Sequence, residues 1–433
     1  MSEFSYRTIT MVGLGYIGLP TAALLASRGL RVVGVDTDER AVATINAGSV
    51  HIVEPDLDIV VRSTVTTGNL RATTEPEPAD AFLVAVPTPL KGGGGGGAGG
   101  ERGDPEPDLS HVEAAARAIA PVLERGNLVV LESTSPVGTT ERLSAWLAEE
   151  RPDLAFPHEA GEGCEVHVAH CPERVLPGQV LQELVANDRI IGGLTPACAE
   201  AARALYESFV KGECLLTGAR TAELCKLAEN ASRDVGIGFA NEIALVCESL
   251  GINPWELIEL ANRHPRVNIL RPGPGVGGHC IAVDPWFIVH SAPEAARLIR
   301  TAREVNDAKP GQVVARVRAK AERFRDPAIA CFGLAFKADI DDLRESPALG
   351  IVQALAEAVE ADGAGRLLVV EPHVERLPAS LAGRERVALV DRREALAGAD
   401  IVVGLVDHRA FFDIAHDELD EKIVIDTRGM WRS

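Results

Sequence analysis

The chain has 433 residues, of which 46% are hydrophobic and 24% charged, and its formal net charge is −20. This length and composition predict a globular protein of two or three domains. The acidic balance argues against nucleic acid or an anionic membrane as a partner, because both attract basic surfaces. No apolar run reaches the roughly 18–20 residues of a membrane span, and the N-terminus lacks a signal-peptide pattern. We therefore expect a cytoplasmic protein.

Residues 7–36 show the pattern strand, glycine turn, helix, strand. Gly13, Gly15 and Gly18 form a GxGxxG motif after the first strand, and Asp36 closes the second strand. In dinucleotide-binding folds such glycines let a pyrophosphate approach a helix N-terminus, and the acid binds the ribose hydroxyls. The pattern predicts an NAD site.

The predicted cofactor site also includes Tyr16 and Ile17, which lie within the glycine turn. The negative charge of Asp36 would repel a 2′-phosphate, which favours NAD over NADP. Arg40 lies one turn further on and would suit such a phosphate, so NADP stays open.

Two further strands are predicted within 81–89 and 127–140, and each ends in small polar residues. Thr88 and Thr134 follow these strands at the carboxyl edge of a parallel sheet, where ligands collect. They are candidates for contact with cofactor or substrate, and a turn or helix-cap role is the alternative. The glycine-rich stretch between Lys91 and Asp104 predicts a mobile surface loop without chemistry.

The eight cysteines form no CxxC pair, which suits a reducing compartment. The segment CEVHVAHC resembles metal-ligand spacing. Strand alternation would put Cys164 and His170 on one face and His167 and Cys171 on the other, which argues against a four-ligand site. We therefore expect no metal.

Residues 220–250 read as one long, largely apolar helix. Lys226 and Asn230 are four residues apart, and Asp234 and Asn241 continue near the same stripe. A polar ridge on such a helix must face solvent or a wet cleft, while the apolar residues must be buried. A helix that joins two domains would meet both needs.

The C-terminal third returns to α/β periodicity, with strand patterns within 328–337, 366–372, 400–408 and 422–429 and a helical pattern at 346–359. It lacks a second GxGxxG, so we expect it to bind something other than a dinucleotide. Lys337 and Arg344 follow its first strand, where phosphate contacts are expected.

The predicted fold class is α/β, with two Rossmann-like doubly wound domains joined by a long central helix. The predicted domains are residues 1–205 for NAD binding, 206–308 for a central helical domain that carries Lys226 and Cys280, and 309–433 for a second Rossmann-like domain.

Residues 273–287 read GPGVGGHCIAVDPWF and place Cys280 and Asp284 just after a run of glycines. Glycines let backbone pass close to a ligand, so the cysteine is either presented to a ligand or buried behind a turn. If the segment is helical, Cys280 lies in the first turn, where the helix dipole lowers a thiol pKa, and Asp284 faces the same way.

The glycine motif, CPERVLPGQ, the Lys226/Asn230 helix, GGHCIAVDPWF and FGLAFKADIDDLRESP occur in this order. Over essentially the whole chain the sequence resembles the UDP-glucose/GDP-mannose dehydrogenase family of nucleotide-sugar 6-dehydrogenases. The resemblance implies NAD-dependent oxidation of a sugar C6 from alcohol to carboxylate, with two NAD and without release of the aldehyde. It also implies dimerisation through residues 206–308 and UDP-sugar binding by residues 309–433.

Within that family, GGHC followed by VDPWF resembles the branch that acts on UDP-N-acetyl-hexosamines. The combination with CPERVLPG and ELVANDRIIGG implies UDP-N-acetyl-D-mannosamine as substrate, and UDP-N-acetylglucosamine or another UDP-hexose is the alternative.

An aldehyde is a poor hydride donor until a nucleophile makes it tetrahedral. The expected nucleophile is the Cys280 thiolate, which would form a thiohemiacetal and then a thioester. Asp284 would act through a water as the base, with a cap or salt bridge as its structural alternative. Lys226 and Asn230 would stabilise the oxyanions. By resemblance, Glu173 assists thioester hydrolysis and Thr134 holds water.

The resemblance also implies the ligand contacts. The expected substrate contacts are Arg174, Lys226, Asn230, Arg266, Gly277 and Lys337, and Arg344 is assigned to the cofactor as well. Arg266 would reach a partner's sugar site, which implies a homodimer or higher oligomer.

Two other functions compete with this one. A two-electron dehydrogenase of the hydroxy-acid type shares the Rossmann domain, long helix and Lys/Asn pair, but it needs no presented cysteine. An NAD-responsive redox sensor would use Cys280 as the sensing thiol, and it would turn over no nucleotide sugar.

Overall fold

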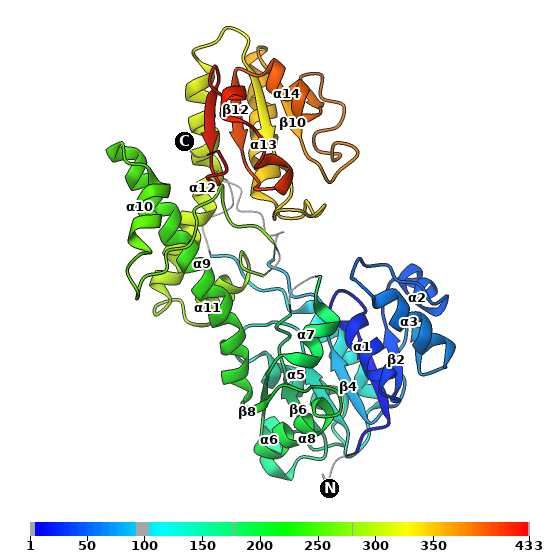
Figure 1. Cartoon of the computed structure of the whole chain (residues 1–433). Helices are drawn as coiled ribbons and strands as arrows, with labels where there is room; N and C mark the ends of the chain where they lie inside the picture. The colour runs from blue at the N-terminus through cyan, green and yellow to red at the C-terminus, as the bar shows by residue number, and fades with distance from the viewer. Residues whose placement is uncertain (1–4, 92–103, 176–177, 279, 432–433) are drawn as a thin grey trace. The chain divides into compact units, whose positions relative to one another are not determined.

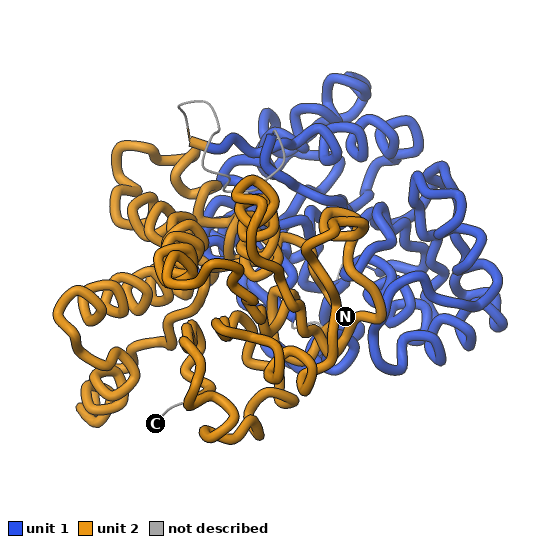
Figure 2. Tube along the Cα trace, turned by 90° about the horizontal axis from the view of Figure 1, so that it is seen from above, with its two compact units in different colours: residues 1–93, 105–229 blue, residues 94–104, 230–433 orange. Residues whose placement is uncertain are grey.

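The computed structural model describes residues 5–91, 104–175, 178–278 and 280–431. The chain divides into unit 1, residues 1–93 and 105–229, and unit 2, residues 94–104 and 230–433 (Figure 2). The predicted glycine-rich loop lies almost wholly outside the described residues. Among the described residues, no helix is long and apolar enough to cross a membrane. The cytoplasmic location stays a prediction.

Unit 1 contains an eight-stranded sheet with the order β3-β2-β1-β4-β5-β6-β7-β8 (Figure 1). Neighbouring strands from β3 to β6 are parallel, β6 and β7 are antiparallel, and β7 and β8 are parallel again. The strands are β1 Thr8–Val12, β2 Arg31–Val35, β3 Leu70–Thr73, β4 Ala81–Val84, β5 Leu128–Leu131, β6 His167–His170, β7 Arg189–Gly193 and β8 Cys214–Gly218. The strand order reverses between β1 and β4, where open α/β sheets bind ligands.

Helices cover both faces of this sheet, which explains why β4 and β5 are apolar along their whole length. One core lies under α1, α3, α7 and α8, and the other under α4 and α5. The helices are α1 Gly18–Ser27, α2 Glu39–Asn46, α3 Leu57–Thr66, α4 Ser110–Ile119, η1 Ala120–Val122, α5 Thr139–Glu150, α6 Pro157–Ala160, η2 Gly161–Gly163, α7 Val180–Ala186 and α8 Pro196–Tyr206.

Unit 2 contains a five-stranded parallel sheet with the order β11-β10-β9-β12-β13. Its strands are β9 Ala328–Phe332, β10 Arg366–Val370, β11 Val387–Leu389, β12 Ile401–Gly404 and β13 Ile423–Asp426. Its other elements are α10 Pro254–Ala261, α11 Asp284–Ser291, α12 Arg297–Ala321, α13 Pro347–Asp362, α14 Arg392–Gly398, η3 Arg409–Phe411 and η4 His416–Glu418. Here too a core lies on each face of the sheet.

The predicted long helix is confirmed as α9, Ala219–Leu250, which begins in unit 1 and ends in unit 2. The expectation that its polar ridge meets solvent or a wet cleft is wrong for Asp234 and Asn241, which are both fully buried. Arg303 of α12 donates to the Asp234 carboxylate at 2.6 Å, and Asn306 donates to the same oxygen at 2.9 Å. The neighbouring helix α12 supplies these hydrogen bonds, while Oδ2 of Asp234 has no hydrogen-bond partner among the described residues.

The predicted fold class is confirmed, since both units are α/β with sheets of mainly parallel strands. The four strands and the helix predicted in the C-terminal third are present. The sequence pattern did not indicate β11, which has only three residues. The domain boundaries at residues 205/206 and 308/309 stay a prediction.

Candidate active-site residues in the two units

The glycine motif lies at the carboxyl end of β1. Gly13 has φ +91°, and a Cβ there would lie 2.4 Å from the carbonyl oxygen of Ala85. A Cβ on Gly18 would lie 1.8 Å from the carbonyl oxygen of Gly13, so α1 packs directly on the turn. At Gly15 a Cβ would meet no atom within 4 Å. The motif thus combines a tight turn with open space beside a helix N-terminus, which fits a pyrophosphate.

Asp36, at the end of β2, is anchored to this turn. Its carboxylate accepts the amide of Leu14 at 2.9 Å and that of Asp38 at 3.0 Å. The side chain is half-buried, so its remaining lone pairs can serve a ribose. Arg40 is exposed in the first turn of α2, where its amide donates to the Asp38 side chain.

The other two turn residues lie just ahead of α1. Tyr16 is 39% exposed and Ile17 is half-buried at the N-cap position. Both belong to the turn that carries Gly15, and their contact with a cofactor stays a prediction.

Thr88 and Thr134 lie after β4 and β5 and contact each other. The Thr88 hydroxyl donates to the carbonyl oxygen of Thr134 at 2.5 Å. Both are half-buried at the carboxyl edge of the sheet. The structure brings the pair together at the predicted edge, and the hydrogen bond also fits the turn role that the sequence left open.

Glu223 of α9 holds the loop that carries Thr134, and the sequence analysis missed it. Its buried carboxylate accepts the amides of Gly138 and Thr140 at 2.6 and 2.7 Å. It therefore caps α5, whose own N-cap is Gly138 and offers no side chain. The sequence did offer a signal for Glu223, which is a charged residue among apolar ones. It lies one turn before Lys226, which is half-buried.

Glu173 follows β6 and is 8% exposed. Its carboxylate accepts from the guanidinium of buried Arg189 at 2.6 Å and from the amide of Arg174 at 2.6 Å. The Arg174 guanidinium in turn pairs with Glu229 of α9 at 2.7 Å. Both predicted residues are thus held in defined positions by ionic partners.

A second buried acid, Glu132, lies just after β5. The hydroxyl of Tyr206 donates to its Oε1 at 2.6 Å, and its Oε2 has no hydrogen-bond partner among the described residues. Burial raises the pKa of Glu132 to about 7. The sequence analysis did not single out this acid.

In unit 2, Cys280, Asp284 and Asn230 form one connected group. Cys280 is exposed in a turn, and its carbonyl oxygen accepts the amides of Val283 at 3.1 Å and Asp284 at 2.9 Å. Asp284 is 3% exposed and begins α11. Asn230 of α9 donates its side-chain amide to the Asp284 carboxylate at 2.6 Å.

This arrangement corrects one expectation and adds a contact to another predicted residue. Cys280 lies one turn ahead of α11 and not in its first turn, because the helix begins only at Asp284. One amide hydrogen of Asn230 is committed to Asp284, although its role was predicted toward a substrate oxygen. The NH₂ group carries a second hydrogen for that role.

The glycines before Cys280 pack against the loop after β9. A Cβ on Gly277 would lie 2.5 Å from the carbonyl oxygen of Glu345, and Gly278, at φ +86°, lies against the ring of Phe336. The amide of Gly273 donates to buried Asn241 at 2.9 Å. These glycines are therefore required by close packing, and they bring the cysteine segment onto the loop that carries Lys337 and Arg344.

The basic residues of unit 2 that were predicted to contact the substrate differ in their surroundings. Lys337 is exposed. Arg344 makes a bidentate pair with Asp342, at 2.9 and 2.6 Å. Arg266 is exposed after α10, and its amide donates to the ring of His264 at 3.3 Å. Asp342 was not among the predicted residues.

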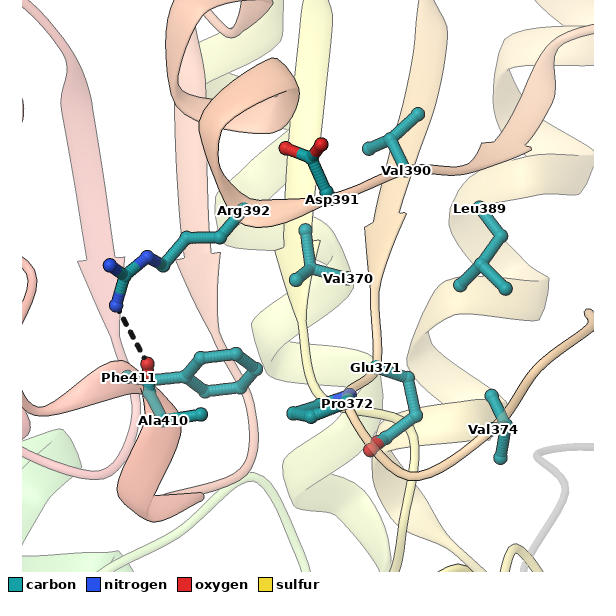
Figure 3. A pocket seen from close by; sticks show the side chains of 10 residues that line it. All are labelled: Val370, Glu371, Pro372, Val374, Leu389, Val390, Asp391, Arg392, Ala410 and Phe411. Atoms are coloured by element: carbon teal, nitrogen blue, oxygen red, sulfur yellow. Dashed lines mark hydrogen bonds between the residues drawn. The ribbon is translucent and has the colours of Figure 1, made fainter.

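A cavity of about 440 Å³ lies at the carboxyl end of β10 (Figure 3). Glu371, Asp391, Arg392 and Phe411 are among its lining residues, and Lys337 and Arg344 are not. The Arg392 guanidinium donates to the carbonyl oxygen of Ala410 at 2.9 Å. The cavity is thus separate from the predicted phosphate contacts.

Comparison with known proteins identifies the family. Three models of the UDP-glucose/GDP-mannose dehydrogenase family match: the NAD binding domain at residues 7–210, the central domain at 220–308 and the UDP binding domain at 330–433. The chain belongs to the UDP-glucose/GDP-mannose dehydrogenase family. It is therefore an NAD-dependent oxidoreductase that acts on a nucleotide sugar.

Individual members of the family resemble the chain over nearly its full length. An NDP-N-acetyl-D-galactosaminuronic acid dehydrogenase of Ralstonia nicotianae is 64% identical over 99% of this chain and 97% of its own. A UDP-N-acetyl-D-mannosamine dehydrogenase of Yersinia pestis is 58% identical over 99% and 100%. The solved UDP-D-ManNAc dehydrogenase of Pyrococcus horikoshii has a TM-score of 0.82 and 38% identity, covering 98% of this chain and 96% of its own.

Proposed function

We propose that the protein oxidises C6 of UDP-N-acetyl-D-mannosamine to the carboxylate in two successive hydride transfers, with Cys280 as the covalent nucleophile. The observation that carries this proposal is the group in unit 2, where Asn230 donates to Asp284 at 2.6 Å and the Asp284 amide donates to the Cys280 carbonyl. A nucleophile and a fixed carboxylate one turn apart, with an amide donor from α9 on the carboxylate, suit acyl chemistry on a bound aldehyde.

NAD supplies the hydride acceptor for both oxidations when it is bound. In unit 1 the space at Gly15 and the Asp36 carboxylate would hold its pyrophosphate and ribose, with Tyr16 and Ile17 in the same turn. Thr88 would contact the cofactor after β4.

Asp284 would accept, through a water, the proton that the C6 alcohol loses in the first oxidation. The Cys280 thiolate then adds to the aldehyde carbon, which gives a thiohemiacetal that can lose the second hydride. The product is a Cys280 thioester, and water attacks its carbonyl carbon to release the carboxylate and the thiolate. Overall, one alcohol, one water and two NAD⁺ yield one carboxylate, two NADH and three protons.

The surrounding residues would stabilise charge. The Lys226 ammonium and the second amide hydrogen of Asn230 would stabilise the oxyanion of each tetrahedral species. Glu173, fixed by Arg189, would assist hydrolysis of the thioester, and Thr134 would hold water. These two roles come from the family resemblance.

The substrate contacts are also proposals. Lys337, Arg344 and Arg174 would bind the nucleotide-sugar, with the backbone of Gly277 close to it, and Arg344 would serve the cofactor as well. Arg266, exposed on unit 2, would complete a partner's site in a homodimer or higher oligomer.

A second substrate has specific support. The relative that is 64% identical is named for N-acetyl-D-galactosaminuronic acid, so the N-acetyl-galactosamine epimer competes with the mannosamine epimer. UDP-N-acetylglucosamine is the third candidate.

The test is the amount of NADH formed per sugar consumed, with the three UDP-N-acetyl-hexosamines and UDP-glucose in parallel. Two NADH per UDP-N-acetyl-D-mannosamine, with kcat/KM at least about tenfold above every other sugar, would support the proposal. If the galactosamine epimer is preferred and yields two NADH per sugar, the proposed four-electron chemistry stands and only the proposed substrate is wrong. One NADH per sugar would reject the cysteine mechanism in favour of a two-electron dehydrogenase.

A further inference from the structure

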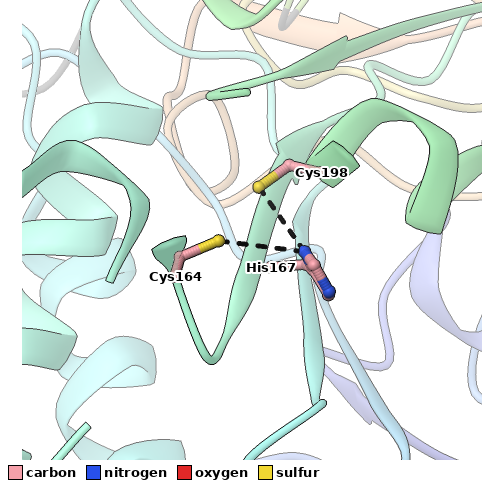
Figure 4. A group of neighbouring side chains, drawn as sticks. All are labelled: Cys164, His167 and Cys198. Atoms are coloured by element: carbon pink, nitrogen blue, oxygen red, sulfur yellow. Dashed lines mark hydrogen bonds between the residues drawn. The ribbon is translucent and has the colours of Figure 1, made fainter. Parts of the chain in front are cut away.

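Three soft ligand side chains come together in unit 1, away from every residue assigned above: Cys164, His167 and Cys198 (Figure 4). The Nδ1 atom of His167 lies 3.9 Å from the Cys164 sulfur and 3.8 Å from the Cys198 sulfur. All three ligand atoms lie within 4.8 Å of one another. The expectation that strand alternation separates Cys164 from His167 is wrong, because β6 begins only at His167.

The cluster joins three elements. Cys164 ends η2, His167 is the first residue of β6, and Cys198 lies in the first turn of α8. His170 and Cys171, the other members of CEVHVAHC, do not join it, and both are buried elsewhere. Cys198 contributes in their place from a position that no local spacing indicates.

The geometry of the cluster also fits a metal site. One ring nitrogen can share only one proton, yet both sulfurs face it, at distances longer than a good hydrogen bond. In a tetrahedral zinc site, with bonds of about 2.3 Å to sulfur and about 2.1 Å to nitrogen, neighbouring ligand atoms lie about 3.6–3.8 Å apart. The observed separations of 3.8 and 3.9 Å are close to this spacing.

Two hydrogen-bond donors also surround the Cys198 sulfur and would stabilise its thiolate form. The amide of Val168 donates to it at 3.4 Å and the Thr195 hydroxyl at 3.3 Å. Cys198 is fully buried, whereas Cys164 and His167 are half-buried, so one side of the cluster reaches solvent. Outer hydrogen bonds of this kind orient metal ligands.

We propose that Cys164, His167 and Cys198 bind one zinc ion, with water as the fourth ligand. Two thiolates and an imidazole are the donors that select zinc among the abundant divalent cations. His167 lies at the amino end of β6, opposite the carboxyl edge that carries Glu173 and Thr134, so the ion is structural. It fastens α8 and the η2 loop to the sheet.

A second group, Asp339, His373 and His408 in unit 2, meets the same distance criterion. There the Nδ1 atom of His408 already accepts the amide of Asp339 at 2.9 Å, and its Nε2 lies 3.1 Å from the carboxylate of Glu371. Both ring nitrogens are committed, so this group is not proposed as a metal site.

The test uses the full chain, purified without a polyhistidine tag, with zinc measured by mass spectrometry of the elements. We expect about one zinc per chain, a thermal midpoint that falls by a few degrees on chelation, and recovery of the midpoint with zinc chloride alone. Cys164→Ser and Cys198→Ser should lose most of the zinc. NAD binding by the variants serves as the folding check.

Three matched variants should keep the zinc. Cys214→Ser removes another half-buried thiol of unit 1, Cys280→Ser removes the exposed thiol of unit 2, and His373→Asn removes a member of the second group. Zinc that is lost only with Cys280 or His373 would place the ion elsewhere and overturn the proposal.

Two further results would also overturn it. The first is wild-type protein that holds no zinc and gains no thermal stability when zinc is added. The second is an intact mass lower by two hydrogens, with a Cys164–Cys198 disulfide found by peptide mapping of the unreduced chain. The wild-type measurements decide the question even if the variants fold poorly.

Discussion

The turns after β1 and β9 have similar sequences but differ in how much space surrounds them. After β1 the chain reads Gly13, Leu14, Gly15, and after β9 it reads Gly333, Leu334, Ala335. Both first glycines have positive φ, +91° and +102°. Gly15 is exposed beside open space, whereas Ala335 is 1% exposed and forms part of the core.

The acids that follow β2 and β10, Asp36 and Glu371, also differ in burial and in hydrogen bonding. Glu371 is 5% exposed, and one of its oxygens accepts the amides of Leu334 and Ala335 at 2.7 and 3.1 Å and faces His408 at 3.1 Å. Because Nδ1 of His408 accepts the Asp339 amide, the ring proton is on Nε2, which donates to Glu371.

Burial acts to raise the pKa of Glu371, but the hydrogen bonds from His408 and the amides outweigh it and lower that pKa. Three donors of unit 2 thus converge on one oxygen of Glu371, while among the described residues each oxygen of Asp36 accepts one amide. An acid in this position can bind a ribose only where the protein leaves its lone pairs available. Unit 1 does so after β2, whereas in unit 2 the acid after β10 binds the amides of its own turn.

The largest expected effect is that of Asp36→Ala. It removes the predicted ribose contact and the anchor of the glycine turn, so we expect KM for NAD to rise about a hundredfold with KM for the sugar unchanged. Steady-state kinetics would measure this. Asp38→Ala is the control, because it removes only the cap of α2. Equal rises for both variants would contradict the assignment of Asp36.

Glu371→Ala should act on stability and not on NAD binding. It leaves the amides of Leu334 and Ala335 and the ring of His408 without their buried acceptor, which should cost about 2 kcal/mol of unfolding free energy. Chemical unfolding would measure the loss. A large rise in KM for NAD with unchanged stability would show that the second acid also serves a dinucleotide.

Glu132 gives the opposite pH response from Glu371. Its folded pKa of about 7 lies above the unfolded value, so its contribution to stability is complete below about pH 4.5 and is lost as the pH rises through 7. Between pH 5.5 and 7.5 the loss should be about 1–2 kcal/mol.

Glu132→Gln should flatten that part of the stability curve because an amide does not ionise, and its oxygen still accepts the hydrogen bond from Tyr206. Unfolding at several pH values would test this, with the exposed Glu357→Gln as control. An unchanged slope in Glu132→Gln would show that this carboxyl ionises normally.

The smallest expected effect is that of Gly15→Ala. Its Cβ would meet no protein atom within 4 Å, so stability should not change. If the space holds the pyrophosphate, KM for NAD should rise about tenfold, as kinetics would show. A rise no larger than that of Gly350→Ala, another glycine with open space around it and without a positive φ, would contradict the site.

The sequence predicted the parts of the molecule that depend on local pattern. The glycine turn, the acid after β2, the helix α9 and the four C-terminal strands follow from periodicity and turn chemistry, and the structure contains them. The family motifs indicated Cys280, Asp284 and Asn230, of which Asp284 and Asn230 are directly bonded.

What the sequence could not predict depends on tertiary partners. Asp234 looked like a solvated residue because its partner, Arg303, lies 69 positions away. Cys198 joins Cys164 only because α8 packs beside the start of β6, and no local spacing encodes that contact. The start of α11 was missed by one turn because its cap at Val283 carries no polar side chain.

The most direct test of the central claim is a count of hydrides in a single turnover with UDP-N-acetyl-D-mannosamine. Wild-type protein and Cys214→Ser should each form two NADH per sugar. Cys280→Ser should form no more than one and leave the sugar at the aldehyde, because no thiohemiacetal can carry the second transfer. Two NADH per sugar from Cys280→Ser, at the wild-type rate, would contradict the account.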